Sequence, residues 1–192
     1  MFRKLVVLSL VAAVAALSPV LAAEKFKIFV DAAWVSPLGD TTFSDLDDID
    51  LEGTYEAADA VGWNFGFEWR WTELLGVEVD YLMSSNDVEV DGDTTGELDV
   101  NPLSASLNIH LIHADFDLWV APTISWVNFD AEDTSVDSEF AYGATLGAAF
   151  YFTDRFGIEG AIRYLDLSAD AEDLGSVAID PLIARAGVAF RF

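Results

Sequence analysis

The sequence predicts an all-β fold, an eight-stranded antiparallel up-and-down β-barrel that spans a membrane. Three observations lead to this fold class. Apolar residues alternate with small, polar or charged ones in eight segments, which is the period of a β-strand with two unlike faces. The bulky aromatic residues fall on the apolar face of these segments, and the connectors between segments are alternately short and long. This pattern favours a barrel whose apolar face meets lipid.

The first segment, residues 1–22, has the layout of a secretory signal peptide, which is removed from the mature protein. It has a basic start, an apolar stretch from Leu5 to Leu17, and small residues before a cleavage site after Ala22. The alternative is an uncleaved helical anchor, but the apolar stretch is short for a membrane span. We therefore expect a cleaved signal peptide at 1–22 and one barrel domain at 23–192.

Eight segments of the mature chain are long enough to cross a bilayer as tilted strands, which needs about 9–11 residues each. In the first, Phe26, Ile28 and Val30 share the apolar face, while Lys27 and Phe29 share the other. An even number of strands is typical of bacterial barrels. The eight expected strands cover residues 26–35, 61–71, 75–84, 103–111, 116–126, 142–152, 156–164 and 182–192.

The connectors between these strands differ in length. The links near residues 71–73, 111–115 and 153–154 are short, whereas the others are long and polar: 36–56, 84–99, 128–139 and 166–180. Short turns at one end and long loops at the other are typical of outer-membrane barrels. A soluble β-sandwich or barrel also alternates, but it would bury its bulky apolar side chains inside. We therefore expect a bacterial outer-membrane location, with extracellular loops and periplasmic termini.

The charge is strongly acidic, with 34 Asp and Glu against 9 Lys and Arg, a formal net charge of −25. This balance argues against nucleic acid as a partner, because phosphate contacts need a basic patch. The four long connectors hold 23 of the 34 acidic residues. Carboxylate oxygens bind Ca²⁺ or Mg²⁺, so loosely bound cations are one interpretation of these loops, and a solvated surface suited to a saline habitat is the other. The cation candidates are Asp45, Asp47, Asp48, Asp50, Asp91 and Asp93.

The interior of an eight-stranded barrel is narrow and mostly filled by side chains. Charges of both signs fall on the inward face, and they are expected to pair, since buried ions need partners. A filled, ion-paired lumen and a narrow path through it both remain open. In a path, Phe29, Leu82 and Trp119 would form an apolar constriction. The expected lumen residues are Phe29, Glu68, Arg70, Glu78, Asp80, Trp119, Glu159, Arg163 and Arg185.

We expect no enzyme and no catalytic residues. The chain has two histidines, His110 and His113, and no obvious nucleophile set stands beside them. Ser104 and Ser106 share the face of His110, but any polar lumen gives that arrangement. No cysteine occurs, so neither a disulfide framework nor a cysteine zinc site is expected. No firm cofactor or metal is expected.

Pro122 falls inside the fifth expected strand, on the lipid face. Proline cannot donate to a strand ladder, and it belongs at edges, strand starts or bulges. An unpaired carbonyl facing lipid is costly, so we expect a bulge or a lateral opening of the wall at Pro122. A local bulge without a transport role is the simpler alternative.

Several short motifs resemble the OmpW family of eight-stranded outer-membrane proteins. They are Trp34-Val35-Ser36-Pro37, Gly62-Trp63-Asn64-Phe65, Thr153 to Leu167, and the ending from Ile179-Asp180-Pro181 to Phe192. The resemblance implies passage of small hydrophobic molecules from outside into the outer membrane. The C-terminal residues Val188, Phe190 and Phe192 resemble the signal that the barrel-assembly machinery recognises in outer-membrane proteins. Expected partners are therefore this machinery, outer-membrane lipids and lipopolysaccharide, and small hydrophobic solutes.

Two functions follow from these expectations. The first is a narrow channel or binding protein for small hydrophobic molecules. The second is a structural or adhesion barrel with a sealed, ion-paired lumen and acidic surface loops.

Overall fold

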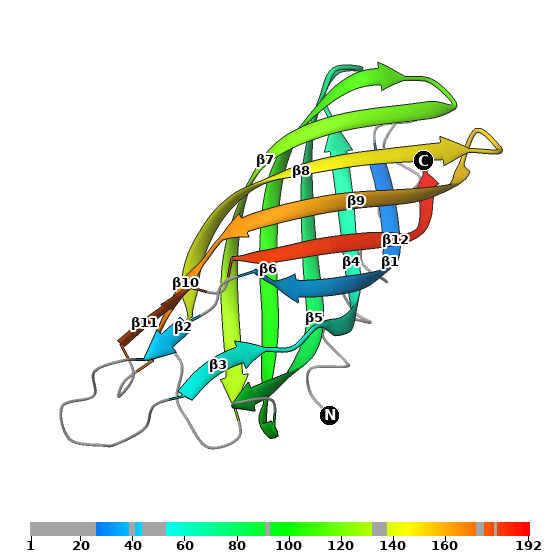
Figure 1. Ribbon diagram of the computed structural model, residues 1–192. Helices are drawn as coiled ribbons and strands as arrows, with labels where there is room; N and C mark the ends of the chain where they lie inside the picture. Colours follow the sequence, from blue (N-terminus) through cyan, green and yellow to red (C-terminus); the bar gives the residue numbers. More distant parts are fainter. Residues whose placement is uncertain are drawn as a thin grey trace.

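The computed structural model describes residues 26–38, 41–43, 53–90, 93–131, 138–171, 175–178 and 180–192. Within them the predicted fold is confirmed: eight long antiparallel strands close into a barrel (Figure 1). Among the described residues, no helix is long and apolar enough to cross a membrane. The expected signal peptide lies outside the described residues.

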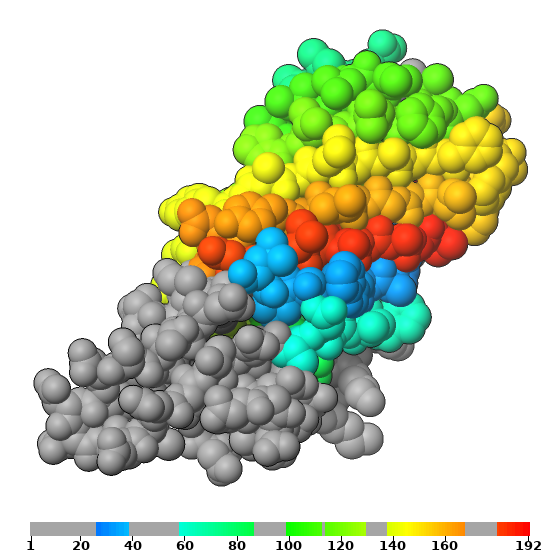
Figure 2. Space-filling view, viewed as in Figure 1, coloured from blue at the N-terminus to red at the C-terminus, as the bar shows by residue number. Residues whose placement is uncertain are grey.

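The barrel strands follow one another around the ring, and the ring closes between β1 and β12 and between β5 and β6. Each strand pairs with its neighbours in the order β1, β4, β5, β6, β7, β8, β9, β12. Figure 2 shows the part of the ring from β7 (green) to β4 (cyan) as one continuous outer wall. The strands are β1 (Phe26–Pro37), β4 (Ala60–Arg70), β5 (Leu75–Val90), β6 (Asp93–His113), β7 (Phe116–Ala131), β8 (Glu139–Tyr151), β9 (Phe156–Asp166) and β12 (Pro181–Arg191).

Three of the expected long loops differ from the prediction. Residues 84–99 form no loop, because β5 and β6 continue as a paired hairpin as far as Val90 and Asp93. The loop regions 36–56 and 166–180 contain four short strands: β2 (Thr41–Phe43), β3 (Gly53–Ala57), β10 (Ser168–Ala171) and β11 (Gly175–Ala178). β2 and β3 extend the sheet alongside β5, and β10 and β11 form a separate hairpin. The polar composition of these regions predicted loops. Backbone pairing stabilises strands there without the apolar alternation on which the prediction depended.

The tight turns at the opposite end share one sequence device. The hydroxyl of Thr72 accepts hydrogen bonds from the backbone N–H groups of Leu74 and Leu75. Thr153 does the same for Arg155 and Phe156 in the turn between β8 and β9. A threonine side chain that binds the backbone two residues on is a recognised turn former. These turns set the end of the barrel at which the C-terminal strand β12 also finishes (Figure 1).

The two faces of the wall divide as the alternation predicts. Outward residues are large, apolar and exposed, among them Trp69, Leu146 and Ile162. Inward residues of the same strands are buried, and many are charged. Aromatic rings gather at the turn end of the outer face, where Phe26 stacks on Trp69 and Phe190 lies 5.4 Å from Phe192. A girdle of aromatic residues at the edge of the apolar band is expected where a barrel crosses the membrane interface.

Candidate functional site

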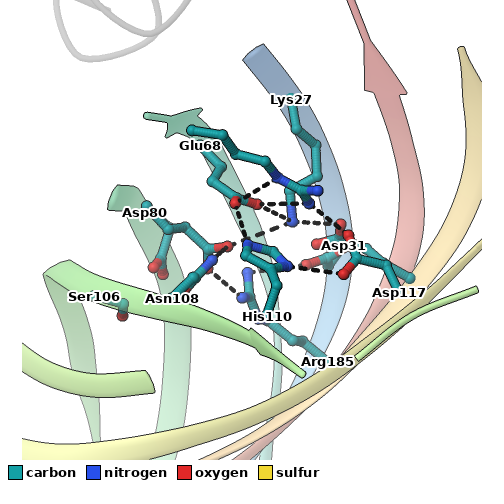
Figure 3. Close-up of polar contacts among 12 residues, drawn as sticks. Lys27, Asp31, Glu68, Asp80, Ser106, Asn108, His110, Asp117 and Arg185 are labelled. Atoms are coloured by element: carbon teal, nitrogen blue, oxygen red, sulfur yellow. Dashed lines mark hydrogen bonds and ion pairs between the residues drawn. The ribbon is translucent and has the colours of Figure 1, made fainter. Parts of the chain in front are cut away.

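The lumen contains a layer of paired charges, which we call the belt. Its side chains, some of which are labelled in Figure 3, come from seven of the eight barrel strands when His110 is included, and all are buried except Arg191, which is half-buried. The basic members are Lys27, Arg70, Arg163, Arg185 and Arg191, the acidic members are Asp31, Glu68, Glu78, Asp80, Asp117 and Glu159, and His110 is the remaining ionisable member. Four of the nine basic residues of this acidic chain are therefore buried inside the barrel, and Arg191 joins them half-buried at the turn end.

Lys27 lies at the centre of the belt. Its ammonium group is 3.0 Å from Glu159, 3.1 Å from Glu68 and 3.5 Å from Glu78, so one side chain of β1 joins carboxylates of β9, β4 and β5. The same nitrogen lies 4.5 Å from the centroid of the Trp119 ring. Fully buried cations need both charge partners and hydrogen bonds to offset desolvation, and Lys27 has three such partners.

Two arginines pair carboxylates across the lumen above Lys27. Arg185 lies 2.5 Å from Glu78 and 3.2 Å from Asp31. Arg163 donates two parallel bonds to Asp80, at 2.9 Å and 2.7 Å. A planar guanidinium fits a carboxylate in this two-bond geometry, which a lysine cannot reproduce.

At the turn end, Arg70 and His110 complete the belt. Arg70 donates to Glu68 at 2.8 Å and to Asp117 at 2.5 Å. His110 contacts the same two carboxylates, Glu68 at 2.7 Å and Asp117 at 2.8 Å. Arg191 approaches Asp117 from β12 at 3.1 Å. This end of the lumen is thus bridged by side chains from β4, β6, β7 and β12.

A group of hydroxyls continues the belt toward the loop end. Ser106 and Thr123 share a hydrogen bond of 2.8 Å, and Thr123 bonds Thr145 at 3.0 Å. Arg163 donates to Thr145 at 3.0 Å and to Ser104 at 2.8 Å. These bonds satisfy the small polar side chains that the alternation places inside the wall.

Above the hydroxyls the lumen changes character and becomes an apolar layer. Its members are buried side chains with no charged group among them: Ala33, Val35, Ala60, Leu82, Val100, Val127, Ala141, Leu165, Leu167 and Ile183. A separate apolar cluster surrounds Phe29 and Trp119 at the level of the belt. The indole of Trp119 lies against Gly147 of β8, where a Cβ would overlap the ring. Glycine at that position is what allows the large ring to fit in the narrow lumen.

The outer wall has a break in its ladder next to Pro122. β6 and β7 are paired at Ser106–Thr123 and again at Ile109–Val120, but not at the two positions between them. On its other side Pro122 pairs normally with Ala144 of β8. The interruption therefore lies on the β6 side, where proline has no N–H to donate. The irregularity in register is displaced toward the turn end, between His110 and Ile112.

A shallow hollow, open to the outside and with a volume of about 400 Å³, lies on the outer wall at this break. It is lined by apolar residues of four strands, together with Ser106 and Thr123. The apolar lining residues are Val77, Ala105, Leu107, Pro122, Ile124 and Tyr142. The short side chains of Ala105 and Pro122 leave room between their larger neighbours.

The structure places every expected lumen residue on the inner face, and all nine are buried. The list of expected lumen residues omitted Lys27, Asp31, His110, Asp117 and Arg191, although the alternation already placed Asp31 and His110 on the inward face. Three of them, Lys27, Asp117 and Arg191, directly follow the outward residues Phe26, Phe116 and Phe190. The alternation could therefore have placed these three on the inward face. The partners within the belt could not be read from the sequence, because they are up to 154 residues apart, as for Arg185 and Asp31.

The acidic cation candidates are not tested by the structure. Asp45, Asp47, Asp48, Asp50 and Asp91 lie outside the described residues, and Asp93 is described only as the first residue of β6. In the described part of the chain, no group of three His, Cys, Asp or Glu side chains is arranged to hold a metal ion. Val188, Phe190 and Phe192 lie in line on the outer face at the end of the chain.

Comparison with known proteins agrees with this architecture. A model of the outer membrane protein beta-barrel domain matches residues 5–192. The chain belongs to this family. The resemblance expected from the sequence, to eight-stranded outer-membrane barrels of the OmpW kind, is confirmed at the level of family and fold, and with it the bacterial outer-membrane location. A search of curated proteins found no match.

Three solved structures illustrate the likeness. OprG from Pseudomonas aeruginosa has a TM-score of 0.77 at 17% identity, covering 88% of this chain and 96% of OprG. The outer-membrane protein AlkL in lipid bilayers has 0.64 at 13%, covering 91% and 93%. Neisserial surface protein A has 0.62 at 15%, covering 90% and 100%. At these identities the likeness shows the fold.

Proposed function

We propose that this outer-membrane barrel binds small hydrophobic molecules and passes them sideways into the membrane at the break beside Pro122. The observation that carries the proposal is the apolar hollow at an interrupted ladder, on a wall that is otherwise continuously paired there. A wall that lacks ladder bonds at two positions opens with a smaller loss of hydrogen bonding than a fully bonded one.

The filling of the lumen supports the same route. A solute that enters from the loop end meets mainly hydrocarbon in the apolar layer, where the buried hydroxyls of Ser84 and Ser125 carry no charge, and this suits an apolar molecule and opposes ions. Further along, the belt of paired charges opposes passage to the turn end. The break near Pro122 lies between these two barriers, next to the hydroxyls of Ser106 and Thr123.

The test is uptake of n-octane by cells that carry the protein in their outer membrane. The wild-type protein is expected to raise the rate over cells without it, and Pro122→Val, which restores an N–H to the wall, is expected to lower it again. Pro102→Val is the matched control. Pro102 sits in β6 where the β5–β6 ladder is also interrupted, but it faces inward and does not line the hollow.

Equal uptake by wild type and Pro122→Val would overturn the lateral route. No acceleration by the wild-type protein would overturn the uptake function itself. Protein amounts in the outer membrane must be matched in all strains, because a restored ladder bond also stabilises the barrel.

A second candidate function is a structural or adhesion barrel with a sealed lumen. The ion pairs that span the interior favour it, since they leave the described lumen filled by side chains. This function predicts that the protein shows no conductance events in planar bilayers and does not change the rate of octane uptake. Discrete conductance events would contradict it. Either function is non-catalytic, and the engagement of both ring nitrogens of His110 by carboxylates supports that proposal.

A further inference from the structure

The imidazole of His110 is held between two carboxylates. Nδ1 lies 2.8 Å from Asp117 and Nε2 lies 2.7 Å from Glu68, and the ring is fully buried. An ionised carboxylate can only accept a hydrogen bond, whereas a neutral imidazole can donate from only one nitrogen. Both bonds therefore exist together only if the three side chains share one proton beyond that of a neutral ring.

The same proton balances the charge of the belt. Its described members include five basic side chains and six carboxylates, as given above. When all six carboxylates are ionised, the proton at His110 makes the two signs equal. In an interior closed to water, an uncompensated charge is strongly unfavourable, so the closed belt favours the protonated arrangement.

The bridge made by His110 crosses the lumen at the turn end. Its two carboxylates belong to β4 and β7, which are not neighbours in the sheet. The charged and titratable groups that surround it come from four other strands: Glu68 and Arg70 from β4, Asp117 from β7, Arg191 from β12 and Lys27 from β1. The ring of Trp119 lies 6.1 Å from the imidazole, centroid to centroid.

We propose that His110 is a proton-operated latch at the turn end of the lumen. With the proton, it ties β4 to β7 through Glu68 and Asp117. Without it, one carboxylate faces a nitrogen lone pair and the belt carries an excess negative charge, so this end loosens and admits water. The apolar layer contains no titratable side chain, and the opening is confined to the turn end. The latch does not depend on the proposed uptake function.

The direction of the pH dependence follows from proton counting. An exposed histidine of the unfolded chain loses its proton near pH 6.5. Above that pH the closed barrel binds one more proton than the unfolded chain, so its stability falls as the pH rises. The stabilising contribution is complete at lower pH, where both states hold the proton.

The first experiment measures the unfolding midpoint temperature of the refolded barrel between pH 6 and pH 9. The wild-type midpoint is expected to shift downward across this range, and His110→Gln is expected to remove that shift. His113→Gln removes the other histidine of the chain and serves as the control, with the wild-type shift retained. A wild-type midpoint that does not fall, or a fall that persists in His110→Gln, would overturn the latch.

The second experiment needs no variant of the belt, so it remains decisive if His110→Gln does not fold. Nitrogen NMR of histidine-labelled barrel in lipid distinguishes a doubly protonated ring from a neutral one, and His113→Gln assigns the signals. At pH 7, His110 is expected to show protons on both nitrogens or a proton shared with a carboxylate. A neutral ring with one ordinary unprotonated nitrogen would overturn the proposal.

Discussion

The belt and the apolar layer fill the same lumen in opposite ways. Both lie on the inward face of the same strands, with residues only a few positions apart: in β5, Glu78 and Asp80 belong to the belt and Leu82 to the apolar layer. The belt is stabilised by pairs of specific geometry, such as Arg163 with Asp80. The apolar layer is stabilised by packing, which is non-directional.

This difference predicts two kinds of failure. Removal of one member of the belt leaves a buried charge without its partner, and the effect spreads to every group that shares the partner. Truncation in the apolar layer leaves a cavity whose cost depends on its volume. The belt is therefore the part that demands particular residues, and the apolar layer tolerates exchange between residues of similar size.

The largest effect is expected for Arg185→Leu. The substitution removes the guanidinium that lies 2.5 Å from Glu78 and 3.2 Å from Asp31. The two buried carboxylates then lose the cation that they share. Breaking a buried pair costs about 3–5 kcal/mol. Urea unfolding of the refolded barrel, followed by gel mobility of unheated samples, measures the loss.

Arg185→Lys is the control for this prediction. It keeps the positive charge but not the planar guanidinium that reaches two carboxylates, so we expect a loss of stability smaller than that of Arg185→Leu. If Arg185→Leu were as stable as the wild type, the belt would be hydrated, and the contrast with the apolar layer would disappear.

The next effect tests the apolar layer with Leu165→Ala. Leu165 is fully buried in β9, and a truncation of this kind costs about 2–5 kcal/mol through lost burial and the cavity left behind. Leu165→Met conserves volume and is expected to cost less than about 1.5 kcal/mol. Urea unfolding compares the two variants. Equal losses would show that shape matters in this layer as strictly as in the belt.

The sequence predicts the wall far better than the interior. Alternation of Phe26, Ile28 and Val30 with Lys27 and Phe29 is sufficient to assign faces, because strand geometry has a period of two. It places the charges inside, but it does not pair them. Which carboxylate Arg185 meets depends on the shear of the closed barrel and on side-chain length, and neither is visible in one sequence.

Strand ends were predicted less well than strand centres. The acidic composition of 84–99 indicated a loop, yet backbone pairing extends β5 and β6 to Val90 and Asp93. Polar residues are compatible with a strand outside the bilayer, where both faces meet water. Pro102 was also missed: like Pro122, it stands at an interrupted ladder, but it faces the lumen.

The smallest effects come from an exchange of valine and threonine, which have nearly the same shape. Thr145→Val removes a hydroxyl that accepts from Arg163 at 3.0 Å and bonds Thr123 at 3.0 Å. Val35→Thr adds a hydroxyl where the neighbouring strand positions are Ile183 and Ala60, both apolar.

Both substitutions are expected to destabilise the barrel by about 1–3 kcal/mol, although they change polarity in opposite directions, because each leaves a buried polar group without a partner. In the belt that group is the Nε–H of Arg163; in the apolar layer it is the new hydroxyl itself. The midpoint of urea unfolding gives both values. A neutral Val35→Thr would mean that water reaches the apolar layer, and the barrier to ions would then have to come from the belt alone. A neutral Thr145→Val would mean that Arg163 is held sufficiently by Asp80, and that the hydroxyls between the two layers serve the break at Pro122 rather than the ion pairs.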